Sequence, residues 1–499
     1  MKNRILSSTL CVLAFVPVAC EKNTEHEQVP VEIALSVSPS ELAFSSENEV
    51  KVLSVETDAS EVEITDNLSW LVIEKTEDGF SIEALENTAT DSRSGVLTVF
   101  AIEGKYKETL EVKVTQQGAG AKAQFPDAEF RRLMLELCDA DGDGLISQAE
   151  ADRVGELDLV YDSESTERPV IKSLEGIKLF RNLRNLDCSF NALTSLDLSG
   201  MEHLEFVDCS YNLLTSLNLS ACPKLLQVYA NVNALTSLDL SGNEALKFVQ
   251  AYKNRISSFE LKDKVDLGYL DISQNALTSI KISGCPKLGI LNCGSNYLTR
   301  LDLSDLPYLY SLGCYRNSLV SIDVSGFPEL LMLECYDNNI TMLDLSACPT
   351  LGSVRCSNNL IEELLLPQNK KDLVTYVICS GNRLKSLDVT MYPNLKTLDC
   401  ATNFLTELKV SGCSMLESFK CDENLLEALD LSGLTSLINF TCTDNKLSEL
   451  SLVECSSIEI VDAQRNPLQS LWITAKQQSS KLQIKTDDNE SIVKVVESL

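Results

Sequence analysis

The chain has 499 residues, with 73 aspartates and glutamates against 42 lysines and arginines, and a formal net charge of −31. A surface this acidic repels phosphate backbones and anionic headgroups, which argues against nucleic acids as partners. The sequence holds only two histidines, His26 and His203, and this scarcity argues against a histidine metal centre or a Ser-His-Asp triad.

The first residues predict a targeting segment. Lys2 and Arg4 precede the apolar run ILSSTLCVLAFVPVA, which is short for a bilayer span and has the length of a signal-peptide core. Ala19 stands directly before Cys20, as at a bacterial lipoprotein cleavage site. We expect residues 1–19 to be a signal peptide, Cys20 to carry lipid and residues 20–32 to form a polar tether. An ordinary secretory signal with an accidental cysteine is the alternative. The expected location is the bacterial outer membrane, exposed at the surface, with the N-terminal lipid as the only membrane contact.

Residues 33–117 alternate apolar and polar positions in short runs such as VEIALSV and TLEVKVTQ, which turn residues separate. This pattern is typical of a small antiparallel β-sandwich. The segments SWLVIEK (69–75), NTATDSRSGVLTV (87–99) and VTQQGAG (114–120) resemble the BACON family of Bacteroidetes-associated, carbohydrate-binding, often N-terminal domains. Trp70 could stack on a sugar, but its apolar flank favours a place in the core. Residues 118–124 are predicted to be a linker.

Residues 125–182 predict a cap with one calcium site. The apolar residues of one helix face are Phe130, Leu133, Met134 and Leu137. The following DADGDGLISQAE (139–150) matches the twelve-residue EF-hand loop. Its ligands would be Asp139, Asp141, Asp143, the Leu145 carbonyl, Ser147 and the bidentate Glu150. We find no second loop in the sequence, so we expect one calcium ion in a structural role, with SLEGIKLF (173–180) completing the cap.

From residue 183 the chain follows the pattern L-x-x-L-x-C-x-x-N-x-L-x-x-L-x-L. The period is 21 residues with one unit of 23, which predicts a leucine-rich-repeat solenoid of about 14 coils over 183–466 and a C-terminal cap over 467–499. The repeat asparagines are Asn191, Asn212, Asn233, Asn254, Asn275, Asn296, Asn317, Asn338, Asn359, Asn382, Asn403, Asn424, Asn445 and Asn466. Their amides should satisfy backbone groups that no strand partner reaches. The fold class is therefore mainly β, with a sandwich, a single EF-hand-type helical cap and a solenoid whose far side is extended.

Ten of the 18 cysteines share one repeat position, three residues before the asparagine. Neighbouring Cβ atoms in parallel strands lie about 4.8 Å apart, beyond good disulfide geometry, so we expect buried free thiols. These repeats resemble those of the internalin J type, which belong to bacterial surface adhesins. The resemblance implies surface-exposed binding and specifies no ligand.

A ligand face is predicted on the concave sheet, at positions −3, −1 and +1 from the cysteine position. The aromatic residues there are Phe206, Tyr229, Phe248, Tyr252, Tyr269, Tyr315, Tyr336 and Tyr376. Such rings can stack on sugars or anchor a protein, although aromatic residues also simply suit strands. We expect a protein that binds a glycan, glycoprotein or protein partner through this face, in an oligomeric state that the sequence leaves open. The alternatives are a stalk that displays the BACON-like domain and, third, a glycan-processing enzyme. No acidic pair departs from the repeat pattern, so we expect no catalysis.

Overall fold

The computed structural model describes residues 32–89, 91–120, 124–161, 169–369, 371–487 and 492–497. The predicted signal peptide, Cys20 and residues 21–31 of the predicted tether lie outside this set. The chain divides into two compact units between Ala119 and Gly120, inside the predicted linker. In the part of the chain that the structure describes, no helix has the length and apolar character to cross a membrane.

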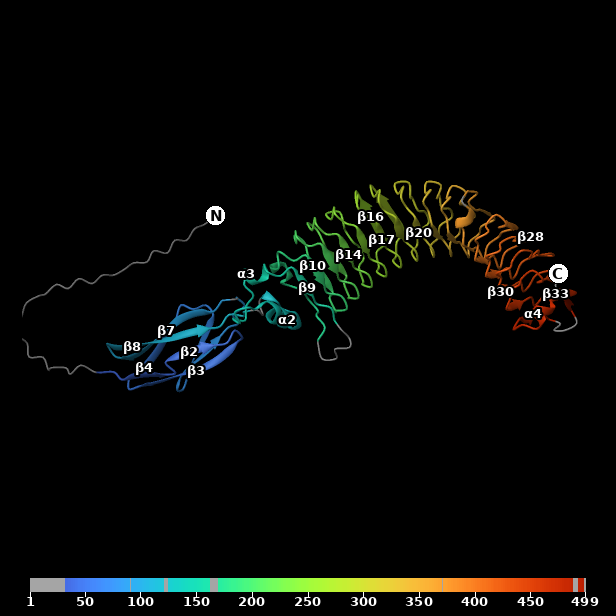
Figure 1. Cartoon of the computed structure of the whole chain (residues 1–499). Helices are drawn as coiled ribbons and strands as arrows, with labels where there is room; N and C mark the ends of the chain where they lie inside the picture. The colour runs from blue at the N-terminus through green and yellow to red at the C-terminus, as the bar shows by residue number, and fades with distance from the viewer. Residues whose placement is uncertain are drawn as a thin grey trace, which may run out of the picture. The chain divides into compact units, whose positions relative to one another are not determined.

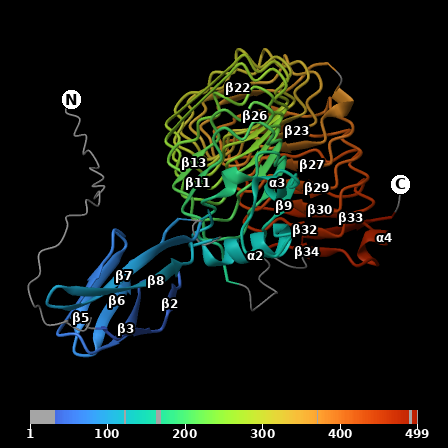
Figure 2. The ribbon, with the colours of Figure 1, turned by 90° about the vertical axis from the view of Figure 1, so that its left-hand side faces the viewer.

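The first unit is a sandwich of two four-stranded sheets, as predicted (Figures 1 and 2). One sheet has the order β1-β3-β6-β5 and the other β2-β8-β7-β4, and every pair is antiparallel except β2 with β8. Alternate residues of both sheets, such as Leu53, Ile82, Leu97 and Val112, form one buried core. The strands are β1 (Leu35–Ser38), β2 (Glu41–Phe44), β3 (Glu49–Thr57), β4 (Glu61–Thr65), β5 (Leu71–Thr76), β6 (Gly79–Ala84), β7 (Arg93–Glu103) and β8 (Tyr106–Gln116).

The second unit begins with a helical cap. Helix α2 (Ala128–Cys138) is followed by a loop, the four-residue helix α3 (Gln148–Ala151), strand β9 (Glu156–Asp158) and the 3-10 turn η1 (Ile177–Leu179). Phe130 and Met134 are buried as predicted, and the buried face continues to Cys138. Leu137 is 60% exposed, so its assignment to that face is wrong. Positions 137 and 138 both lie about one turn beyond Met134, and the packing against the first coils buries Cys138 rather than Leu137.

The solenoid carries one sixteen-stranded parallel sheet, here called the inner sheet, on the inner side of its arc (Figure 1). Fourteen strands belong to the predicted coils, and the two caps contribute β9 and β34. The strands after β9 are β10 (Asn185–Asp187), β12 (Phe206–Asp208), β14 (Gln227–Tyr229), β15 (Phe248–Gln250), β17 (Tyr269–Asp271), β19 (Ile290–Asn292), β20 (Ser311–Gly313), β21 (Met332–Glu334), β23 (Ser353–Arg355), β25 (Tyr376–Ile378), β27 (Thr397–Asp399), β29 (Ser418–Lys420), β30 (Asn439–Thr441), β32 (Ile460–Asp462) and β34 (Gln483–Lys485).

The far side of the coils is extended, as predicted, and forms short parallel sheets. Their strands are β11 (Ser195–Asp197), β13 (Ser216–Asn218), β16 (Ser258–Lys262), β18 (Ser279–Ser283), β22 (Met342–Asp344), β24 (Glu363–Leu365), β26 (Ser386–Asp388), β28 (Glu407–Lys409), β31 (Glu449–Ser451), β33 (Ser470–Thr474) and β35 (Val493–Val496). The remaining elements are the 3-10 turn η2 (Lys371–Leu373) and helix α4 (Ala475–Gln478).

The repeat asparagines tie each coil to the one before it. The Oδ1 atom of Asn296 accepts the N–H of Leu277 at 2.9 Å. Its Nδ2 donates to the carbonyls of Ile272 and Cys293 at 3.2 and 3.0 Å. The same pattern recurs along the solenoid, which confirms the predicted role. These backbone groups lie where the strand ladder has ended, so without the amide they would be buried and unpaired.

The cysteine positions are buried beneath the inner sheet. The ten ladder cysteines are Cys188, Cys209, Cys293, Cys314, Cys335, Cys356, Cys379, Cys400, Cys421 and Cys442. All sixteen cysteines in the described residues are free thiols. Burial is the main cause that raises the pKa of Cys293 to about 12, and the nearby Asp271 carboxylate adds to it. The ladder therefore behaves as a column of small apolar side chains.

Candidate functional site

Four of the predicted aromatic residues form a continuous row on the N-terminal half of the inner sheet. The ring centroids of Phe206, Tyr229, Phe248 and Tyr269 are separated successively by 5.6, 5.0 and 4.3 Å. The last pair is stacked, with an angle of 7° between the ring planes. All four rings are half-buried. Phe248 and Tyr269 are opposite each other in the strand register and stack, whereas Tyr229 lies two positions along its strand from that column and meets Phe206 and Phe248 at tilted angles of 46° and 32°.

A second pair lies further along the same sheet. Tyr315 and Tyr336 stack with centroids 4.8 Å apart and planes 5° from parallel. A Cβ atom on Gly294, one coil earlier, would lie 2.6 Å from the Tyr315 ring. The missing side chain of Gly294 therefore leaves the space in which Tyr315 lies. Burial is the main cause that raises the pKa of the Tyr269 hydroxyl; a hydrogen bond with Gln250 opposes it, and the nearby Asp271 and Tyr315 raise it further.

The two other predicted residues lie apart from these rings. Tyr376 is exposed on β25, and no ring contact joins it to another aromatic residue in the described ranges. Tyr252 is half-buried, and burial, followed by a hydrogen bond with Tyr211, raises its pKa. Tyr252 therefore lies near Tyr211, at the repeat position that Tyr315 and Tyr336 also hold, and Tyr269 of the row adds to its pKa shift.

Two aromatic residues at this rim were missed from the sequence. Phe190 and Tyr211 stack at 4.4 Å with an interplanar angle of 8°, and they are 49% and 42% exposed. Each directly precedes a repeat asparagine and has a positive φ, 57° and 53°. Most other coils place a polar residue at this strained position, such as Lys253 or Arg316. A bulky ring on consecutive coils there is the signal that could have found them.

Most carboxylates on the inner sheet already have partners within the sheet. Asp208 accepts hydrogen bonds from the N–H and Oγ of Ser210 at 2.8 and 2.6 Å. Burial nevertheless raises its pKa, and the charge of Asp187 on the neighbouring strand contributes. Asp271 is held in the same way by Ser273, at 2.9 and 2.6 Å. These carboxylates stabilise turns after the strands, which leaves the aromatic rings as the main groups available to a partner.

The loop over 139–150 draws three of its predicted calcium ligands together. Carboxylate oxygens of Asp139, Asp141 and Asp143 lie within 4.8 Å of one another. Asp139 accepts the N–H groups of Gly142 and Gly144 at 2.8 and 3.0 Å, and both glycines have a positive φ. The structure thus brings hard oxygen donors to one point, which is the ligand set that calcium prefers.

Glu150, Ser147 and Leu145 make the other hydrogen bonds that hold the loop together. Glu150 accepts the N–H of Ala140 at 2.8 Å and the N–H and Oγ of Ser147 at 2.9 and 2.8 Å. The Ser147 bonds are the largest cause that lowers the pKa of Glu150 to about 2. Leu145 follows Asp143, whose carboxylate accepts its N–H at 2.8 Å. Glu150 is thereby kept ionised and aimed back across the loop.

The comparisons with known proteins agree with this architecture. Residues 59–117 match the family model of the BACON domain, described as a putative N-terminal binding domain. The solved functional domain of internalin J (InlJ) from Listeria monocytogenes, which includes a cysteine ladder, is 25% identical, with a TM-score of 0.57 over 74% of this chain and 77% of that chain. An internalin (InlF) from the same species is 19% identical over 64% of this chain and 95% of its own, with a TM-score of 0.47. No curated protein matches the sequence.

These matches confirm the two resemblances found in the sequence. The N-terminal domain contains the BACON family pattern, and the second unit is a leucine-rich-repeat solenoid with a cysteine ladder like that of internalin J. A putative binding domain joined to a repeat solenoid is the organisation of a binding or interaction protein.

Proposed function

We propose that the inner sheet binds a macromolecular partner, and that this partner presents a protein or glycoprotein surface. The observation that carries the proposal is the set of contacting aromatic rings formed by the row from Phe206 to Tyr269 and the stacked pair Tyr315 and Tyr336. Half-buried aromatic side chains on a rigid surface contribute contact area at a low cost in conformational entropy.

The direction of the rings favours a protein surface over direct sugar stacking. A sugar ring stacks on the open face of an aromatic ring, but in the pairs stacked at 4.3 and 4.8 Å each ring already has one face covered by its neighbour. Edges and hydroxyl groups remain for the partner, and these groups suit apolar side chains and backbone carbonyls. Phe190 and Tyr211 extend the aromatic surface to the rim.

The stalk hypothesis assigns binding to the sandwich instead. Its obvious platform, Trp70, is half-buried and packs against the sandwich core. The guanidinium of Arg93 lies 4.8 Å from the centre of its ring. This contact reduces the ring area that a sugar could use. We therefore rank the stalk hypothesis below binding by the inner sheet.

The test compares two double variants on the same probes, which are purified mucin, a panel of extracellular-matrix proteins and a glycan array. We expect Tyr315→Ala with Tyr336→Ala to weaken protein binding by about thirtyfold or more, because the loss of a single central aromatic anchor already costs about 2 kcal/mol. The control, Tyr297→Ala with Tyr308→Ala, removes two exposed tyrosines outside the inner sheet and should bind normally. If the first variant binds normally and Trp70→Ala loses binding, then the sandwich, and not the inner sheet, is the part that binds the partner.

The proposal includes a calcium ion in the 139–150 loop and a lipid on Cys20. The clustered carboxylates support the ion, and the apolar run before Cys20 supports the lipid. The ion would hold the cap against the first coils, and the lipid would anchor the protein in the outer membrane with the solenoid at the cell surface.

A further inference from the structure

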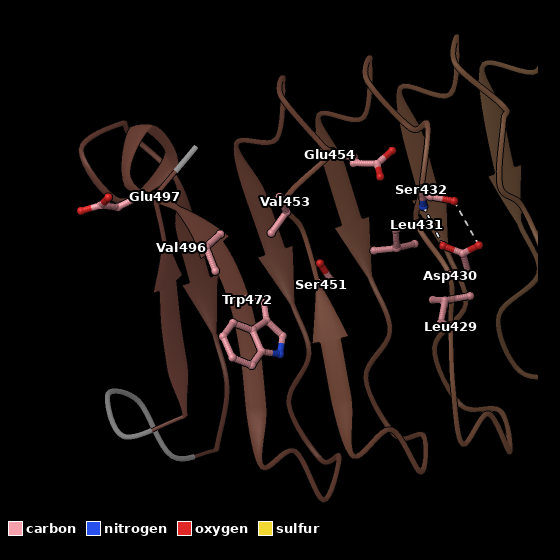
Figure 3. Close-up of a pocket in the computed structure, with 10 residues that line it drawn as sticks. All are labelled: Leu429, Asp430, Leu431, Ser432, Ser451, Val453, Glu454, Trp472, Val496 and Glu497. Atoms are coloured by element: carbon pink, nitrogen blue, oxygen red, sulfur yellow. Dashed lines mark hydrogen bonds between the residues drawn. The ribbon is translucent and has the colours of Figure 1, made fainter. Parts of the chain in front are cut away.

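A pocket of about 420 Å³ lies on the far side of the solenoid near its C-terminal end (Figure 3). Figure 3 shows Trp472 and Val496 at one end, Leu429 and Asp430 at the other, and Ser451 between them. The strands beneath are β31, β33 and β35, which pair in parallel. This pocket is separate from the inner sheet, so nothing in it depends on the proposed partner surface.

The repeat does not require a tryptophan at position 472. The corresponding outward position holds aspartate in seven coils, where the carboxylate caps the following turn; these are Asp197, Asp239, Asp302, Asp323, Asp344, Asp388 and Asp430. Asp430, for example, accepts the N–H of Ser432 at 2.9 Å. Trp472 cannot make this bond, and it is 37% exposed. Its ring contributes apolar area to the pocket instead.

The polar groups of the pocket are mainly hydrogen-bond acceptors. Asp430, Glu454 and Glu497 contribute three carboxylates, and the lining contains no lysine or arginine. Among the described residues Asp430 accepts bonds from Ser432 alone, at 2.9 and 3.0 Å, and Glu454 accepts the N–H of Gly433 at 2.7 Å. A carboxylate has about four acceptor positions, so most of them remain available.

The polar groups that line the pocket determine which kind of ligand it can bind. A sugar hydroxyl both donates and accepts, whereas an ammonium or guanidinium group only donates and carries positive charge. Carboxylates at one end of the pocket and an aromatic ring at the other suit such a ligand, because the carboxylates accept the N–H groups of the cation and the ring packs against its apolar stem. Lys494 pairs with Trp472 in the sheet register but does not line the pocket.

We propose that this pocket binds an ammonium or guanidinium group carried on an apolar stem. The cation lies at the end of the pocket that holds Asp430 and Glu454, and the stem runs past Val453 toward Trp472 and Val496. A free amine and a lysine or arginine side chain of another protein offer the same chemistry.

Tryptophan fluorescence reports on the site directly, because the chain has only two tryptophans. In full-length protein with Trp70→Phe, Trp472 is the only indole. We expect 1,5-diaminopentane to cause a saturable change in its emission, with a dissociation constant below about 10 mM. The isosteric 1,5-pentanediol should cause none, because it lacks the charge. A blocked lysine peptide in a parallel titration distinguishes the two sources, according to which probe binds more tightly.

Charge-neutral variants complete the test. Asp430→Asn with Glu454→Gln should weaken diamine binding roughly tenfold. Asn at position 430 can still accept the Ser432 N–H, so the turn should persist. Asp344→Asn, at the same repeat position outside the pocket, should leave binding unchanged. The proposal is wrong if the diol binds as well as the diamine, if no saturable response occurs, or if the double variant responds like the parent.

Discussion

Replacing Asn338 by alanine tests whether the asparagine ladder holds adjacent coils together. Its Oδ1 accepts the N–H of Leu319 at 2.9 Å, and its Nδ2 donates to the carbonyls of Cys314, Cys335 and Tyr336 at 3.1, 3.0 and 3.3 Å. Alanine removes all four bonds and leaves the buried groups unpaired. At about 1 kcal/mol for each bond, the variant should lose about 3–4 kcal/mol of unfolding free energy.

The adjacent Asn339 is exposed and provides the matched control. Asn339→Ala changes the same residue type one position away, and it should alter the unfolding free energy by less than about 0.5 kcal/mol. Urea unfolding followed by far-ultraviolet circular dichroism measures both variants. Coils contact mainly their neighbours, so Asn338→Ala could also divide one transition into two. Amide exchange at Leu319 should accelerate only in Asn338→Ala. Equal stability of the two variants would refute the idea that the ladder joins the coils.

Three further outcomes are expected from the structure and one, for Cys20, from the sequence alone. Chelating calcium should lower the melting temperature of the wild type, since an ion at 100 times its dissociation constant adds about 2.7 kcal/mol to the unfolding free energy. Asp139→Ala should abolish this response. A wild type whose melting temperature does not change on chelation would count against a filled site. Cys20→Ser should release the protein from the membrane fraction, and unchanged fractionation would contradict lipidation. With its pKa raised to about 12 by burial, Cys293 should resist alkylation in the native protein at pH 8, where only about one thiol in ten thousand is ionised. Alkylation in non-reducing denaturant should then modify it fully, and a linkage to a neighbouring cysteine would overturn the free-thiol assignment. Gly176→Ala should destabilise the cap, because its φ is 99° and an added Cβ would overlap a backbone carbonyl oxygen, whereas Gly155→Ala, which has open space, should be neutral; thermal unfolding separates the two.

The sequence by itself determined the periodic part of this protein. A 21-residue period fixes which side chains recur on each face, so the buried cysteine column, the asparagine ladder and the outward aromatic positions could all be read from spacing. The EF-hand spacing likewise placed Asp139, Asp141 and Asp143 together, because alternate residues of a tight loop point to one centre.

Only the tertiary structure decided how these side chains meet. Tyr315 stacks on Tyr336 because Gly294, on another coil, leaves room for the ring, and this fit depends on side-chain volume across coils. The α2 helix buries Cys138 and exposes Leu137 because the direction from which the first coils pack selects the face. The acceptor-rich pocket at Trp472 depends on β31, β33 and β35, which bring residues of the last coils and of the C-terminal cap to one place. Spacing along the chain specifies the column in which a side chain lies, but the shape of its neighbours in space specifies its contacts.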